Sequence, residues 1–142
     1  MSAASRALIT GGAGFIGSHL ADALLARGYH VRVLDCLSEQ VHGPVSGFPA
    51  YLNPAVETHH GDVRDRRSVE RALAGVDAVF HFASAVGVGQ SMYEIEKYVD
   101  INNRGTAVLL EALIRRPIEK LIVASSMSVY GEGLYRDSRG NI

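Results

Sequence analysis

Cysteine is nearly absent from the sequence: among 142 residues, Cys36 is the single one. A lone thiol excludes an internal disulfide and is typical of a reducing compartment, so we expect a cytoplasmic protein. Long hydrophobic runs are missing as well, and the apolar stretch near the start is broken by glycines at positions 11, 12 and 14. We therefore expect neither a membrane-spanning helix nor a secretion signal.

The sequence also has no excess of charge of either sign. It carries 14 lysines and arginines against 15 acidic residues, which gives a formal net charge of −1. This balance provides no electrostatic basis for binding nucleic acid or an anionic membrane. With 47% hydrophobic residues, the chain is long enough to bury the core of one domain, which we assign to residues 1–142.

What the sequence does contain is a glycine-rich turn between a strand and a helix. A short apolar run at residues 7–10 leads into Gly11, Gly14 and Gly17, and a helical pattern follows. Gly11 permits a tight turn, Gly14 lets the backbone approach a pyrophosphate, and Gly17 lets the helix lie close to the sheet. The N-terminus of the helix then offers free N–H groups and a partial positive charge to phosphates.

A second strand at residues 30–35 ends in Asp35, 18 residues after Gly17. The helix between Gly17 and this strand ends at Gly28. The apolar face of this helix is expected to consist of Ile16, Leu20, Ala23 and Leu24. A β-α-β unit with such an acid is typical of dinucleotide sites, where the carboxylate binds the ribose hydroxyls. The structural alternative is that the glycines only turn the chain and Asp35 is a solvated strand end.

Residues 37–57 are polar and rich in glycine and proline, so we expect an irregular surface segment. A short strand at residues 56–60 follows, and Asp62 comes just after it, where it is placed to accept a hydrogen bond from an adenine amino group. We do not interpret His59 and His60 as a metal site, because adjacent strand residues point to opposite faces and no further ligands lie nearby.

The next helix begins and ends at recognisable residues. Asp65 is placed to cap it, and Gly75 is placed to stop it. Residues 77–83 are almost wholly apolar, which predicts a strand that is buried on both faces. The loop at residues 86–91 contains a second Gly-x-Gly pattern, and we expect it to be a flexible lining of the active site.

A long helix is predicted at residues 98–115. Gly105 in its middle costs about 1 kcal/mol relative to alanine, which predicts close packing against a neighbour. Asn102 faces either the cofactor or only nearby backbone, and the sequence favours neither. A fifth strand at residues 120–125 ends at the same edge of the sheet. We therefore predict an α/β fold with a doubly wound parallel sheet, a Rossmann fold that is incomplete and has about five parallel strands.

Five motifs in this order resemble those of the extended short-chain dehydrogenase/reductase family, specifically its NAD-dependent nucleotide-sugar epimerases and dehydratases. The resemblance extends along nearly all 142 residues, although Ser84 stands where the family has alanine. The motifs are the glycine fingerprint at residues 10–17, the pair Asp62-Val63, residues 81–84, the helix Tyr98-x-x-x-Asn102-x-x-Gly105-Thr106 and the strand end Ser125-Ser126-x-x-Val129-Tyr130-Gly131.

The resemblance implies NAD as the cofactor, a nucleotide sugar as the substrate and a homodimer as the assembly of the full-length protein. It implies an isomerase or lyase that transfers hydride through the nicotinamide, with Ser126 bonded to the reacting sugar oxygen as a catalytic residue. The residues expected to bind NAD are Gly11, Gly14, Phe15, Ile16, Gly17, Asp35, Cys36, Asp62, Val63, Phe82, Ala83, Ser84, Asn102 and Ser125.

In this family a Tyr-x-x-x-Lys helix beyond the serine-rich strand end supplies the acid–base pair. The sequence has this spacing at Tyr93 and Lys97, before the fifth strand, and we interpret it as fortuitous. Tyr130 does not have the spacing, because Leu134 and not a lysine stands four residues after it. We expect the acid–base pair, the last strands and the substrate-binding region to be absent from this chain. The chain alone is then expected to be inactive, and its fifth strand to form an open edge.

Two classes of function remain open at this point. The first is an epimerase, dehydratase or decarboxylase of nucleotide sugars, with a hydroxysteroid-type dehydrogenase as a more distant candidate. The second is a non-catalytic NAD-binding or sensing module, which needs no tyrosine base.

The acid at position 35 predicts a preference for NAD over NADP. A 2′-phosphate at roughly 5 Å from Asp35, at an effective dielectric constant of about 20, would cost several kcal/mol, or at least a hundredfold in affinity. No arginine lies between Cys36 and Gln40 to offset this repulsion. Titration of the intact protein with both dinucleotides measures the ratio, and equal affinities would refute the assignment.

Overall fold

The computed structural model describes residues 5–131, 133–134 and 136–141. Its five strands are β1 (Arg6–Thr10), β2 (His30–Asp35), β3 (Glu57–His60), β4 (Ala78–His81) and β5 (Lys120–Val123). They form one sheet in the order β3-β2-β1-β4-β5, and every neighbouring pair is parallel. The prediction of about five parallel strands is confirmed.

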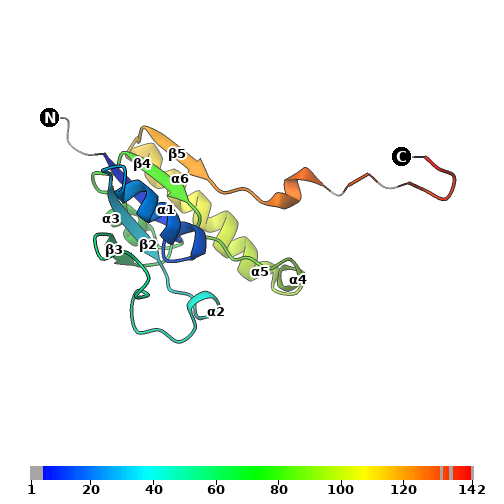
Figure 1. Cartoon of the computed structure of the whole chain (residues 1–142), viewed down its shortest axis with the longest axis horizontal. Coiled ribbons are helices and arrows are strands. Elements are labelled where there is room, and N and C mark those ends of the chain that lie inside the picture. Colours follow the sequence, from blue (N-terminus) through cyan, green and yellow to red (C-terminus); the bar gives the residue numbers. More distant parts are fainter. Residues whose placement is uncertain (1–4, 132, 135, 142) are drawn as a thin grey trace.

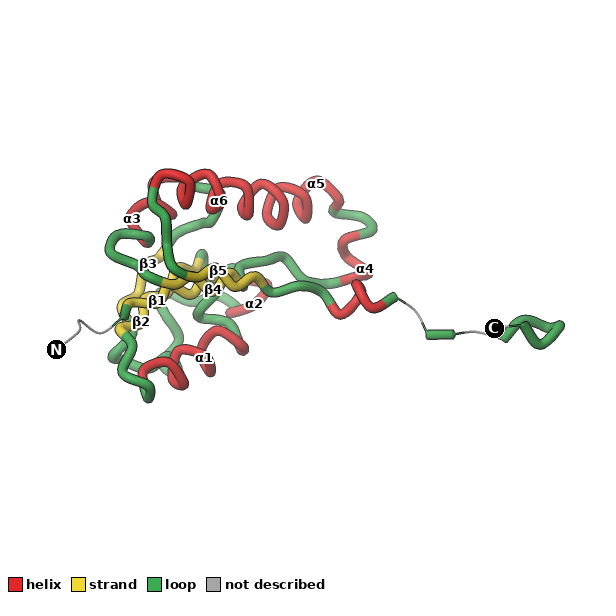
Figure 2. Tube along the Cα trace, turned by 90° about the horizontal axis from the view of Figure 1, so that it is seen from above, coloured by secondary structure: helices red, strands yellow, loops and turns green. Residues whose placement is uncertain are grey.

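Helices cover both faces of this sheet. The α-helices are α1 (Phe15–Leu25), α2 (Glu39–His42), α3 (Arg66–Ala72), α4 (Val88–Ser91), α5 (Ile95–Tyr98) and α6 (Gly105–Arg115), with a π-helix η1 (Val99–Arg104) and a 3-10 helix η2 (Met127–Tyr130). Figure 2 shows α1 on one face of the sheet and α3, α5 and α6 on the other. This is the doubly wound arrangement, so the predicted fold class is confirmed.

The helical run before β5 differs from the single α-helix expected at residues 98–115. It begins at Ile95 as α5, passes through the π-helical turn η1, and continues as α6 to Arg115. A π-helical turn redirects the side chains on either side of it, and hydrophobic spacing does not reveal it. The segment at residues 86–91, expected to be a flexible loop, contains the short helix α4.

Alternating residues of the central strands fill two cores, one on each face of the sheet. Leu8 of β1 packs with Val69 of α3 and Leu109 of α6 on one face. Its neighbour Ile9 packs on the opposite face in the core that includes Leu24 of α1. All five side chains are buried, as expected for a parallel sheet that is covered on both sides.

The buried face of α1 differs in its first turn from the one that its large apolar residues predict. Ile16 is 65% exposed, while the buried residues of the helix include Gly17, Ala21 and Leu24. The helix turns its smallest residues inward because it lies so close to the glycine turn at residues 11–14. The placement of Ile16 on the buried face is therefore wrong, whereas Leu20 and Leu24 pack in the core as predicted.

The helix ends follow the sequence more closely. The Asp65 carboxylate accepts hydrogen bonds from the backbone N–H groups of Arg67 and Ser68, so it caps α3 as expected. Gly28 and Gly75 follow their helices with positive φ angles of 81° and 68°, a conformation that L side chains rarely adopt.

Strand β5 forms an edge of the sheet, next to β4 only, in the described part of the chain. Its side chains are more exposed than those of the central strands: Ile122 is 37% and Val123 50% exposed. After β5 the chain runs away from the domain (Figure 1). None of the helices formed by the described residues has the length and apolar character needed to cross a membrane.

The close packing predicted for Gly105 is confirmed, and it leads to a stability prediction. A Cβ at this position would lie 2.8 Å from Val63 Cγ2. Gly105→Ala gains about 1 kcal/mol of helix propensity but overpacks the core by roughly 1–3 kcal/mol, so we expect a net loss of unfolding free energy of about 1 kcal/mol. Urea denaturation of the intact protein measures it.

The matched background for this substitution is Val63→Ala, which removes the contacted methyl groups. In that background Gly105→Ala should become neutral or stabilising, because only the propensity gain remains. Equal effects of Gly105→Ala in both backgrounds would contradict the assigned contact.

Candidate functional site

The loops that follow β1, β2 and β4 meet at the carboxyl edge of the sheet, and the turn after β1 lies between the other two. Gly11 has φ = 69°, and a Cβ there would lie 2.8 Å from the backbone nitrogen of Ala83. The N–H group of Gly11 donates to the carbonyl of Leu34 at 2.8 Å. The turn is therefore held against β2 on one side and against the end of β4 on the other.

Two more glycines bring helix α1 close to this turn. A Cβ at Gly17 would lie 2.6 Å from the Gly11 carbonyl oxygen and 2.6 Å from Gly12 Cα. The close approach at Gly17 is thus to the turn itself rather than to the strands, which corrects the expectation. Gly12, which the sequence analysis did not single out, is the glycine that faces the sheet: its Cβ would lie 2.4 Å from Val33 Cγ2.

The first turn of α1 is open to an anion. In the described part of the chain, no side chain caps this helix end, and its first turn contains no acidic residue. Gly14 is the N-cap residue, with φ = −73°, so its backbone does not require glycine. Phe15 and Ile16, which begin the helix, are 79% and 65% exposed. The N–H groups of such an uncapped turn bind phosphate well.

The carboxylate of Asp35 lies at the mouth of the turn. Its Oδ2 accepts a hydrogen bond from the Ala13 N–H at 3.0 Å, and its Oδ1 accepts one from the Leu37 N–H at 2.9 Å. His42 Nε2 lies 3.7 Å from Oδ1. Asp35 is buried, but a carboxylate has about four acceptor positions, so it retains capacity for ribose hydroxyls.

Cys36 follows Asp35 and is exposed. Partial desolvation, together with the negative charges of Asp35 and Asp62, raises the pKa of its thiol. The thiol therefore stays protonated at neutral pH and is a poor nucleophile.

A buried histidine joins β1, β4 and α6 beneath the site. Thr10 Oγ1 lies 2.7 Å from His81 Nδ1, and Thr106 Oγ1 lies 3.0 Å from His81 Nε2. The Thr106 hydroxyl donates to the Asn102 carbonyl, so we assign the ring proton to Nε2, and Nδ1 accepts from Thr10. Burial lowers the pKa of His81, which keeps the ring neutral. The Thr10 hydroxyl also accepts from the Ala83 N–H at 3.2 Å.

Asn102 holds the chain that follows β4. Its Nδ2 donates to the Ala85 carbonyl at 3.1 Å, and its Oδ1 accepts from the Ala85 N–H at 2.7 Å. Of the two roles left open by the sequence, the backbone contact is therefore the one present in this structure. Phe82 packs edge-on against Phe80, with ring centroids 6.3 Å apart, and Ser84 is exposed beside them.

The remaining predicted residues divide into two groups. Asp62 and Val63 follow β3; Val63 is 5% exposed and packs in the core, while the Asp62 carboxylate pairs with Arg64. Ser125 and Ser126 follow β5 and are exposed, and the Ser126 hydroxyl accepts from the Ser128 N–H at 3.1 Å. Beyond η2 the chain leads away from the domain (Figure 1), and no hydrogen bond among the described residues joins the two serines to the glycine turn.

Some contacts at this edge carry no sequence signal because they join distant segments. The Tyr51 hydroxyl donates to the Ala13 carbonyl at 2.6 Å, which ties the irregular segment after α2 to the glycine turn. Gln40 of α2 donates to Gln90 of α4 at 2.7 Å, and the Tyr98 hydroxyl donates to the same Gln90 oxygen at 3.0 Å. These contacts join α2, α4 and α5 through the side chain of Gln90.

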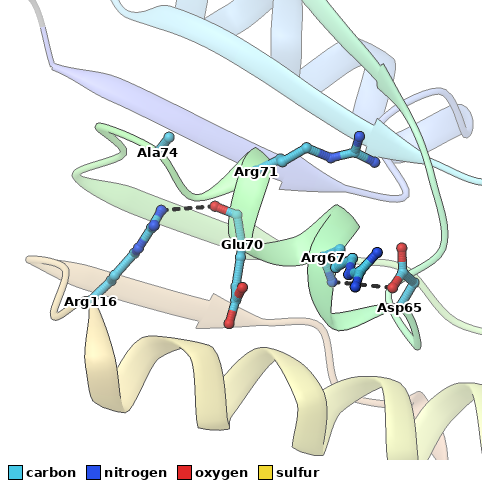
Figure 3. A pocket seen from close by; sticks show the side chains of 6 residues that line it. All are labelled: Asp65, Arg67, Glu70, Arg71, Ala74 and Arg116. Carbon is cyan, nitrogen blue, oxygen red and sulfur yellow. Dashed lines mark hydrogen bonds between the residues drawn. The ribbon is translucent and has the colours of Figure 1, made fainter.

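Two hollows lie outside the turn itself. The larger, about 680 Å³, lies along the outer side of α3 and is lined by Asp65, Arg67, Glu70, Arg71, Ala74 and Arg116 (Figure 3). Acidic and basic side chains alternate there, and Arg116 Nη1 donates to the Glu70 carbonyl at 2.9 Å. A cavity of about 340 Å³ lies beside the segment after Asp35 and is lined by Leu37, Val45, Ser46, Gly47, Phe48 and His60.

Sequence comparison finds relatives along nearly the whole chain. A UDP-glucose 4-epimerase from Neisseria meningitidis serogroup C is 38% identical over 127 residues, which are 88% of this chain and 38% of the relative. One from Streptomyces lividans is 39% identical over 128 residues, which are 88% of this chain and 37% of that protein. The chain thus spans less than two fifths of the length of these curated relatives.

Solved structures give the same result. UDP-glucose 4-epimerase from Brucella ovis in complex with NAD superposes with a TM-score of 0.80 at 33% identity, covering 93% of this chain and 39% of that one. The Bifidobacterium longum enzyme in complex with NAD+ and UDP has a TM-score of 0.75 at 35% identity, covering 89% and 38%. The prediction of NAD agrees with the cofactor named for both structures.

A family model provides the broadest match. The model described as the NAD dependent epimerase/dehydratase family matches residues 7–140, which include the glycine turn, Asp35 and both serines. The chain therefore belongs to the NAD dependent epimerase/dehydratase family.

Proposed function

We propose that this chain is the NAD-binding part of an NAD-dependent epimerase or dehydratase of nucleotide sugars. The observation that carries the proposal is the uncapped N-terminus of α1, which follows a glycine-rich turn, with the Asp35 carboxylate 3.0 Å from the Ala13 nitrogen. The helix end can bind an anion, and the carboxylate beside it can bind a pair of hydroxyl groups. These adjacent positions match the diphosphate and ribose of a dinucleotide.

The predicted residues divide along such a dinucleotide by their position in the fold. Gly11, Gly14, Phe15, Ile16 and Gly17 would bind the pyrophosphate at the helix end. Asp35 and Cys36 would contact the adenosine ribose, and Asp62 and Val63 the adenine. The nicotinamide side would be lined by residues that follow β4 and β5 and by one residue of η1, namely Phe82, Ala83, Ser84, Asn102 and Ser125.

A UDP-sugar is the proposed substrate. Several relatives are named UDP-glucose 4-epimerases, and one structural neighbour, from Thermotoga maritima, was solved with UDP-glucose. The bound nicotinamide would accept a hydride from the sugar and return it. Ser126, at the carboxyl end of β5, would orient the reacting sugar hydroxyl.

We propose that Tyr93 and Lys97 are not the acid–base pair. Tyr93 lies on the connection between α4 and α5 and is 89% exposed, while Lys97 of α5 pairs through Nζ with Glu94 Oε2 at 2.6 Å. In such a pair the tyrosine is the base and the lysine acts on the tyrosine, whereas Lys97 pairs with Glu94.

The proposed assembly is a homodimer in the cytoplasm. Support comes from the outer side of α6, where Leu110 is 45% and Ile114 80% exposed. Large apolar side chains that gather on one helix face favour association with a partner.

Substitution of Asp35 tests the proposal. In the intact protein, Asp35→Asn should raise the Kd for NAD by about tenfold or more, because a charged hydrogen-bond acceptor for the ribose is lost. Interconversion of UDP-glucose and UDP-galactose at saturating NAD should persist. Asp22→Asn removes an exposed carboxylate from α1 and serves as the matched control, with an unchanged Kd.

Calorimetry with NAD and a coupled assay on a panel of nucleotide sugars measure these effects. An unchanged NAD affinity in Asp35→Asn would contradict the assigned binding mode. NAD binding by the wild-type protein without turnover of any nucleotide sugar would favour the sensing module instead.

A further inference from the structure

Arg64 lies between two carboxylates that belong to different elements. Its Nε donates to Asp62 Oδ1 at 3.0 Å and to Oδ2 at 3.1 Å, and its Nη2 donates to Asp62 Oδ2 at 2.6 Å. Its Nη1 donates to Asp100 Oδ2 of η1 at 2.6 Å. One guanidinium group therefore binds the loop after β3 to the π-helical turn before α6.

We propose that Arg64 is a positioning residue that holds the Asp62 carboxylate in the orientation needed to recognise the amino group of adenine, with Asp100 as its second anchor. The inference rests on the proposed NAD-binding function, in which Asp62 faces the adenine.

The geometry leaves Asp62 little freedom to rotate. The backbone N–H of Arg64 donates to Oδ1 at 2.8 Å, while the side chain covers the edge that joins both oxygens. A carboxylate has about four acceptor positions, so those away from Arg64 stay available to a ligand. Planar, two-point contacts of this kind impose direction as well as energy.

The second anchor keeps the guanidinium itself in place. Asp100 Oδ1 accepts from Arg104 Nη1 at 3.0 Å, one helical turn further on, while its Oδ2 accepts from Arg64. Asp100 is thus held by two arginines, and Arg64 by two carboxylates. Lysine cannot replace this arrangement, because an ammonium group is a point charge without the planar fork.

The electrostatics favour an acceptor that never donates. Hydrogen bonds from Arg64 lower the pKa of Asp62, and the bonds from Arg64 and then Arg104 lower the pKa of Asp100. Both groups are therefore ionised at neutral pH, and an ionised carboxylate only accepts hydrogen bonds. Asp62 should accept from a 6-amino group and repel a 6-oxo group at the same place on the base.

A simple structural tie between the loop and η1 would produce the same contacts, so loss of stability alone does not test the inference. Discrimination between two bases does. The probes are NAD and nicotinamide hypoxanthine dinucleotide, in which a 6-oxo group replaces the amino group. For the intact wild-type protein we expect NAD to bind about 10- to 100-fold more tightly, as expected for one charged hydrogen bond.

Arg64→Gln should reduce this ratio at least about fivefold, even if the affinities for both probes fall. Arg64→Lys, which keeps the charge and is less disruptive to folding, should also reduce it. Arg66→Gln is the matched control: it removes the same charge two residues along the chain, from an arginine that pairs with Glu111, and its ratio should stay within about twofold of wild type.

Asp62→Asn separates the failure of this inference from failure of the proposed function. If Asp62→Asn abolishes the preference while Arg64→Gln and Arg64→Lys retain it, the positioning role of Arg64 is overturned and the function stands. If Asp62→Asn retains the preference, Asp62 does not read the base and the inference falls with it. Absence of NAD binding by the wild-type protein would instead reject the proposed function.

Discussion

The site depends on one packing constraint: the turn between β1 and α1 has no room for side chains at Gly11 and Gly12, and helix α1 has none at Gly17. A Cβ at Gly11 or Gly17 would lie within 2.9 Å of backbone atoms, and one at Gly12 would overlap Val33. Contacts this short with backbone leave nothing that could move aside, since backbone is fixed by the strands. The constraint holds the open end of α1 directly above the carboxyl edge of β1 and β2, next to Asp35.

Polar contacts extend this arrangement to the neighbouring elements. The neutral ring of His81 joins Thr10 to Thr106, and Asn102 holds the backbone of Ala85. Arg64 adds a charged tie from the loop after β3 to η1. Buried or partly buried networks of this kind pre-form a binding surface, so that a ligand need not order it on arrival. We infer that the rigid part of the site is its glycine turn with the loops after β3 and β4.

Much of this could be predicted from sequence because the signals are local. Spacing or residue type alone predicts the succession of strands and helices along the chain. It also predicts the cap at Asp65, the acid at Asp35 and the close packing of Gly105. The exposure of Ile16 could not, because the inward face of the first turn of α1 is set by proximity to the glycine turn rather than by hydrophobicity. Gly12 is similar, since its importance depends on Val33 of another strand.

The contacts missed at the site join segments far apart in the chain. Tyr51 reaches Ala13 across 38 positions, and Gln40 reaches Gln90 across 50. Neither pair belongs to a periodic pattern, and the π-helical turn that carries Asp100 was expected to be part of an ordinary helix. Such features arise only when the sheet order brings their elements together.

The central claim is that a dinucleotide diphosphate binds at the N-terminus of α1 while Asp35 binds its ribose. A crystal structure of the intact protein with NAD tests this most directly. The account predicts pyrophosphate oxygens within hydrogen-bonding distance of the backbone N–H groups of Phe15 and Ile16, and ribose hydroxyls on the Asp35 carboxylate. A complex with the pyrophosphate away from this turn, or with Asp35 facing no part of the ligand, would contradict it.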